Sequence, residues 1–153
     1  MDGPVVIGFD GTEVSEAAIR AAAAVMRPGP ALVVAVHEAG IAFQAQVGMD
    51  IQAVPIDYAV TAQADEALME GARVRAARGA EIAREHGFQA EPLVAVDERG
   101  IGETLVRVAR DRGAVAIVVG AHRYGRMERL FLGSTSREVL EHAHCPVLVV
   151  RPD

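Results

Sequence analysis

One stretch in the last third of the chain combines residue types that bind anions. Val119 and Gly120 end a run of apolar residues, and Gly133 is followed directly by the hydroxyl residues Ser134 and Thr135 at the start of a helical pattern. Backbone amides in the first turn of a helix have no partner within the helix, and the helix dipole favours negative charge there. Glycine lets a ligand approach the backbone closely. This spacing favours a phosphate-binding loop.

The same loop is rich in cations, since Arg123, Arg126 and Arg129 lie between the two glycines. Guanidinium groups pair well with phosphate oxygens. Two interpretations need no ligand at all. The arginines can form a solvated loop face, and Thr135 with Glu138 three residues later has the pattern of a capping box. The residues of this loop leave both interpretations open.

A second candidate loop, Gly8-Phe9-Asp10-Gly11-Thr12, follows the first apolar run. A carboxylate at the end of a strand can accept hydrogen bonds from a sugar hydroxyl or an amine, or it can cap the next turn through neighbouring amides. His37 and His122 fall in the other expected ligand loops and are the only plausible general bases. Neither has an obvious orienting partner, so no catalytic residue is predicted.

Composition excludes several classes of protein. The net charge is −6, from fifteen basic and twenty-one acidic residues, and every basic residue is Arg. A chain without Lys has no Walker-type phosphate loop, and a single Cys forms no intramolecular disulfide. His142, His144 and Cys145 can be a helix end and a core thiol as well as metal ligands, so we predict no metal site. We expect no nucleic-acid or membrane partner and a location in the cytoplasm.

Elements of two kinds must position these loops. Five short apolar runs have the composition of buried parallel strands, at residues 5–9, 31–37, 92–96, 115–119 and 147–150. Helical patterns separate them, at about residues 15–26, 56–86, 101–110 and 134–143. This alternation predicts one doubly wound α/β domain over residues 1–153, with helices on both faces of a five-stranded parallel sheet.

Two segments carry more specific expectations. In the longest helical pattern, Leu68, Val74 and Ile82 are expected to face inward. Residues 39–55 have little periodicity and are interpreted as a loop or ragged helix start, with a flap over a ligand or a partner surface as the alternative.

The chain resembles a single-domain universal stress protein over nearly its whole length. The resemblance lies in Val6-Ile7-Gly8-Phe9-Asp10-Gly11-Thr12, in Val118-Val119-Gly120 with Gly133-Ser134-Thr135, and in residues 139–150. Members that bind ATP have Gly, two residues, Gly, nine residues, Gly, then Ser or Thr. Here Gly120, Gly133 and Ser134 fit that pattern, and Arg123 stands in place of the second glycine.

The resemblance implies an adenine nucleotide, ATP or a related one with or without Mg²⁺, bound at the carboxyl edge of a sheet with strand order 3-2-1-4-5. In this family a valine near the end of the second strand packs on adenine, and His37 is assigned that place. The expected nucleotide-binding residues are Phe9, Asp10, His37, Val119, Gly120, Arg123, Gly133, Ser134 and Thr135. Any turnover of ATP is expected to be slow.

The last apolar run is expected to mediate self-association. A short strand at a sheet edge exposes unpaired backbone groups, which natural proteins cover. Pairing with a second copy about a two-fold axis would cover them, and the resemblance implies such a homodimer. The residues concerned are Val147, Leu148, Val149 and Val150. Cover by a helix or by residues 39–55 is the alternative, and a homodimeric module that binds no nucleotide is the alternative function.

Overall fold

The computed structural model describes residues 2–40, 58–97, 99–121 and 132–151. These residues form one parallel sheet in the order β3-β2-β1-β4-β5, which confirms the predicted fold class and strand order. Its strands are β1 (Val5–Gly8), β2 (Pro30–Glu38), β3 (Gln89–Asp97), β4 (Ala116–Gly120) and β5 (Val147–Val150). The central strand β1 aligns Val6 with Leu32 on one side and with Ile117 on the other.

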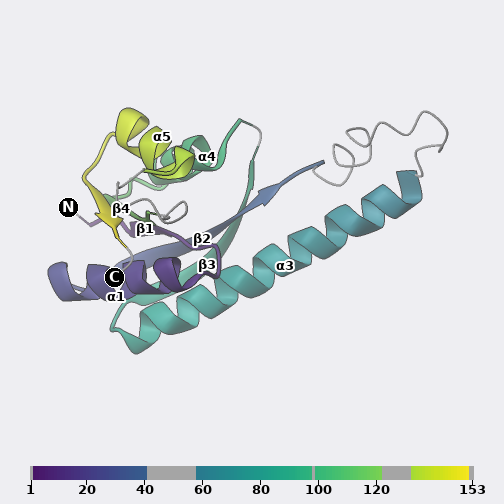
Figure 1. Ribbon diagram of the computed structural model, residues 1–153. Helices are drawn as coiled ribbons and strands as arrows, with labels where there is room; N and C mark the ends of the chain where they lie inside the picture. The colour runs from purple at the N-terminus through teal and green to yellow at the C-terminus, as the bar shows by residue number, and fades with distance from the viewer. Residues whose placement is uncertain (1, 41–57, 98, 122–131, 152–153) are drawn as a thin grey trace, which may run out of the picture.

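The helices lie in two layers, one on each face of the sheet (Figure 1). Helices α1 (Glu13–Val25) and α3 (Tyr58–Glu85) pack on one face, and α4 (Ile101–Asp111) and α5 (Ser134–His142) pack on the other. Alternate residues of each strand therefore enter different cores. Ile7 packs toward α1 and α3, whereas Val6 packs toward α4 and α5, and both are fully buried. Burial on both faces explains why the strands read as continuous apolar runs.

The buried face of α3 differs from the predicted one. Leu68 and Val74 are 43% and 60% exposed, so the expectation that they face inward is wrong, while Ile82 does pack against the core. The buried face consists of small residues: Ala72, Ala76, Gly79, Ala80 and Ala83. Small side chains let the helix axis approach the sheet, and a methyl on Gly79 would lie 2.7 Å from Val33 Cγ1. Close approach of the helix to the sheet, rather than burial of large apolar side chains, determines which face of α3 is buried.

The two edges of the sheet agree only in part with what the sequence predicts. Strand β3 begins three residues earlier than predicted and includes Pro92, which lacks an N–H group and is tolerated because β3 is an edge strand. Strand β5 forms the other edge, and all four of its residues are half-buried. Of the predicted loop or flap at residues 39–55, only Ala39 and Gly40 lie within the described residues. No helix among the described residues is long and apolar enough to cross a membrane.

Candidate functional site

The loop after β1 is organised by Asp10. Its Oδ1 atom accepts hydrogen bonds from the Thr12 backbone N–H at 3.0 Å and from the Thr12 hydroxyl at 2.6 Å. Thr12 in turn is the N-cap of α1 and accepts from the Ser15 N–H at 3.3 Å. The interpretation of Asp10 as a turn cap is therefore confirmed for one carboxylate oxygen. The side chain is exposed and lies at the carboxyl ends of the strands, so capping does not remove it from a ligand.

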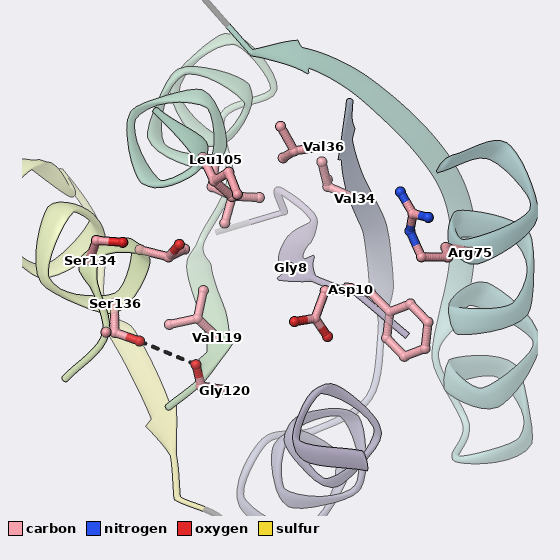
Figure 2. A pocket seen from close by; sticks show the side chains of 14 residues that line it. Gly8, Asp10, Val34, Val36, Arg75, Leu105, Val119, Gly120, Ser134 and Ser136 are labelled. Carbon is pink, nitrogen blue, oxygen red and sulfur yellow. Dashed lines mark hydrogen bonds between the residues drawn. The ribbon is translucent and has the colours of Figure 1, made fainter. Parts of the chain in front are cut away.

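The end of β4 and the start of α5 are held together through Gly120. Its carbonyl oxygen accepts from the Ser136 hydroxyl at 3.2 Å, shown by the dashed line in Figure 2. A methyl on Gly120 would lie 2.6 Å from Val14 Cγ1, so close packing against α1 requires glycine here. Ser136 is almost completely buried, and this contact of its hydroxyl was not predicted from the sequence. The signal for it was its place in the first turn of α5, where a hydroxyl can reach the preceding strand.

The first turn of α5 keeps its backbone amides available. Gly133 is the N-cap, with an ordinary extended conformation and no side-chain cap. The N–H groups of Ser134, Thr135 and Ser136 have no acceptor within the described ranges 2–40, 58–97, 99–121 and 132–151. No atom of the described residues lies within 4 Å of the position that a methyl on Gly133 would take. Among the described residues, this end of α5 therefore combines unpaired donors with open space.

The predicted capping box at Thr135 and Glu138 is wrong. Glu138 Oε2 accepts instead from the backbone N–H of Gly102 at 3.0 Å, across the interface between α5 and α4. Asp97 Oδ1 accepts from the N–H groups of Arg99 and Gly100 at 2.8 and 2.6 Å. Carboxylates of the chain itself thus accept from one amide in the first turn of α4, that of Gly102, and from two amides just before it. Among the described residues, no carboxylate accepts from the first turn of α5, so its amides remain available to an external anion.

These elements enclose a cavity of about 450 Å³ at the carboxyl ends of the strands. Its walls are partly apolar and partly polar, and Figure 2 shows the side chains that line it. The described residues that line it are Gly8, Phe9, Asp10, Val34, Val36, Arg75, Ile101, Leu105, Val119, Gly120, Gly133, Ser134, Thr135 and Ser136. The tertiary structure therefore brings together seven of the nine sequence-predicted site residues: Phe9, Asp10, Val119, Gly120, Gly133, Ser134 and Thr135.

Of the other two predicted residues, His37 is not among the described residues that line the cavity. His37 is buried, and because side chains alternate along β2, it lies on the opposite face from Val34 and Val36, which do line the cavity. Val36, the residue before His37, contributes an apolar side chain to the cavity. The adenine contact expected of His37 stays a prediction. Arg123 lies outside the described residues, as do His122, Arg126 and Arg129. The roles expected of them stay predictions.

Arg75 lines the cavity from α3 and was missed by sequence reasoning. It is half-buried, whereas its neighbours Arg73 and Arg78 are exposed and pair with Glu70 at 3.1 Å and Glu16 at 3.4 Å. No local pattern distinguishes Arg75 from these two. Only the packing of Gly79, one turn later, against Phe9 and Val33 indicates which face of α3 is turned toward the sheet.

The His142–Cys145 cluster has a structural explanation. His142 Nδ1 lies 2.9 Å from the Glu138 carbonyl oxygen, within the last turns of α5. Burial raises the pKa of the Cys145 thiol, so the protonated form predominates. Within the part of the chain that the structure describes, no three His, Cys, Asp or Glu side chains come together as a metal site would require.

Comparison with known proteins agrees with this architecture. The model of the universal stress protein family matches residues 1–151. The chain belongs to the universal stress protein family. Universal stress protein YxiE of Bacillus subtilis is 29% identical to it over 154 residues, which cover 99% of this chain and all of YxiE.

Solved structures of universal stress proteins share the fold. One from Archaeoglobus fulgidus has a TM-score of 0.72 at 21% identity, covering 98% of this chain and 99% of that one. The Archaeoglobus fulgidus protein in complex with dAMP has a TM-score of 0.61 at 22% identity, with 98% and 99% of the two chains covered. A family member from Arabidopsis thaliana with AMP bound has a TM-score of 0.59 at 13% identity, with 99% and 92% covered. Adenine nucleotides are therefore ligands of structural neighbours of this universal stress protein.

Proposed function

We propose that this universal stress protein is a cytoplasmic stress-response protein that binds an adenine nucleotide in the cavity at the carboxyl ends of β1, β2 and β4. A volume of about 450 Å³ lies within the range of about 300–1,000 Å³ that is typical of small-molecule sites. The complexes of structural neighbours with dAMP and AMP support the choice of ligand class.

The observation that carries this proposal is the open first turn of α5. Three consecutive amides, from Ser134 to Ser136, lack acceptors within the described chain, and no described residue has an atom in the space beside Gly133. An anion at such a position gains hydrogen bonds and a favourable interaction with the helix dipole. The hydroxyls of Ser134 and Thr135 add further donors. A phosphate group fits this arrangement better than a neutral ligand does.

The remaining walls suit the rest of a nucleotide. Val34, Val36 and Leu105 present an apolar surface against which a flat base can pack. The carboxylate of Asp10 can accept from a ribose hydroxyl or an amino group. If Mg²⁺ accompanies the nucleotide, the phosphates themselves, Asp10 and nearby hydroxyls are its oxygen ligands.

Binding rather than fast hydrolysis is the proposed activity. The described cavity residues include no His, and the sequence has no Lys to bridge phosphates. Without a positioned general base or a lysine, transition-state charge has few means of stabilisation. We therefore propose that any ATPase activity is slow.

Calorimetric titration with ATP, ADP and AMP, with and without Mg²⁺, tests the proposal. We expect saturable binding and a rise in thermal stability. A ligand at 100 times its dissociation constant should stabilise the folded state by about 2.7 kcal/mol. No heat and no thermal shift at millimolar nucleotide would refute it. An Arg123→Gly variant adds a second comparison, since weaker binding indicates a phosphate contact and tighter binding indicates obstruction.

We also propose that a second copy pairs along β5. Along this edge strand, the backbone N–H and C=O groups of successive residues point alternately toward β4 and toward the open edge. The carbonyls of Pro146, just before β5, and of Val150 accept from Ile117 in β4 and from Ala121, which follows β4. The N–H of Val149 therefore points to the open edge. Replacing Val149 with Pro removes that donor while leaving the β4 ladder intact, so we expect dimers to dissociate in light-scattering chromatography with unchanged helix content.

Light scattering and calorimetry together distinguish three outcomes. An unchanged dimer in the Val149→Pro variant would place the interface elsewhere, and a wild-type monomer would refute self-association. A dimer that binds no nucleotide in the calorimeter would support the alternative function, an interaction module without a ligand.

A further inference from the structure

Arg75 lies in the cavity wall opposite the start of α5. Figure 2 shows its side chain on α3 at one side of the cavity, with Ser134 and Ser136 at the other and Val34, Val36 and Asp10 between them. Its aliphatic stem lies over the β1 loop, because a methyl on Gly11 would be 3.3 Å from Arg75 Cδ. The stem is thereby held in place by packing, and the guanidinium group remains at the cavity.

The guanidinium charge of Arg75 has no ion-pair partner within the described part of the chain. No acceptor or carboxylate there lies within hydrogen-bond or ion-pair distance of its guanidinium, although Arg73 and Arg78 on the same helix both have carboxylate partners. A half-buried guanidinium with five donors at a cavity is suited to a ligand that supplies acceptors or a flat π surface.

We propose that Arg75 is a ligand-binding residue that contacts the base of the bound nucleotide. This inference rests on the proposed function, which places the phosphates at the first turn of α5. With the phosphates there, the base lies toward the other side of the cavity, between the valines of β2 and the guanidinium. Adenine presents ring nitrogens that accept hydrogen bonds, and its face attracts a cation. Arg75 can satisfy either geometry without contacting a phosphate.

The chemistry of this contact separates it from an ordinary phosphate clamp. A base contact stabilises adenosine and AMP equally, because both carry the same base. A phosphate contact stabilises AMP and leaves adenosine unchanged. The comparison of the two ligands therefore identifies which part of the nucleotide Arg75 contacts.

The test uses Arg75→Leu, with Arg73→Leu as the matched control on the same helix. Adenosine and AMP affinities are measured by competition against a fluorescent AMP analogue, and thermal unfolding confirms that each variant is folded. We expect Arg75→Leu to weaken both ligands by a similar factor of about 10, the value of one hydrogen bond to a charged group, and Arg73→Leu to change neither.

Other outcomes overturn the inference in distinguishable ways. Loss of AMP affinity with unchanged adenosine affinity would move Arg75 to the phosphate, and unchanged affinity for both would remove it from the site. In either case the wild type still binds and the proposed function stands. If the wild type binds neither ligand, the proposed function fails and the inference fails with it.

Discussion

Replacing Gly133 with alanine separates nucleotide binding from folding. The residue has φ −60° and ψ 165°, which any amino acid adopts, and no atom of the described residues lies within 4 Å of the added methyl. Reduced freedom of the unfolded chain contributes about 0.4–1 kcal/mol of stability, and loss of a favourable N-cap residue costs a similar amount. We therefore expect the free energy of unfolding to change by less than about 0.5 kcal/mol.

The effect on binding should be much larger. The methyl enters the space beside the amides of Ser134 and Thr135, where the proposed phosphate lies. Displacing the phosphate from one amide removes a charge-assisted hydrogen bond of about 1.5–3 kcal/mol, which corresponds to an affinity loss of about 10- to 150-fold. At a ligand concentration 100 times the wild-type dissociation constant, the stabilisation of about 2.7 kcal/mol should fall to about 1.4 kcal/mol or less.

The assay is thermal unfolding with and without ATP, supported by calorimetric titration. Gly29→Ala is the matched control, because Gly29 also has open space around its added methyl and does not line the cavity. We expect Gly29→Ala to retain the full ligand-induced shift. Equal shifts in Gly133→Ala and wild type would refute the assignment of the phosphate to the start of α5.

Three further predictions concern packing and the single thiol. Gly79→Ala should lower the urea midpoint of unfolding, because its methyl would lie 2.8 Å from the Phe9 ring. Overpacking costs about 1–3 kcal/mol, which exceeds the gain of about 1 kcal/mol in helix propensity. A higher midpoint would contradict this prediction. Gly102→Ala should lower both the urea midpoint of unfolding and the affinity for nucleotide. Its methyl would lie 2.8 Å from the Thr135 carbonyl oxygen and would push α5 away from α4. Unchanged affinity would show that α5 does not move. Since burial raises the pKa of Cys145, the thiol should react with a disulfide reagent along a pH profile shifted to higher pH than in urea, and coincident profiles would contradict the shift.

Much of the fold could be predicted because its signals are local. Continuous apolar strands and periodic helices alternate along the chain, and this order alone indicates a doubly wound sheet. Gly120, Gly133 and Ser134 were predicted together for the same reason, since a strand end, a loop and a helix start follow one another in sequence. Asp10 has both of its predicted properties, a cap for the next turn and a place at the strand ends.

Two features could not be predicted because they depend on contacts between distant segments. Glu138 bonds to Gly102, 36 residues away, instead of closing a capping box within its own helix. That Val36 rather than His37 lines the cavity depends on which face of β2 meets α4, and a one-residue change in that choice reverses every side chain.

The sequence by itself determined the order of strands and helices and the local glycine–hydroxyl pattern, because hydrophobic periodicity and turn chemistry act over a few residues. Only the tertiary structure decided that small residues form the buried face of α3 and that Arg75 reaches the cavity. The physical reason is that a helix with several weakly distinguished faces is oriented by close packing, which Gly79 makes possible against Val33 and Phe9.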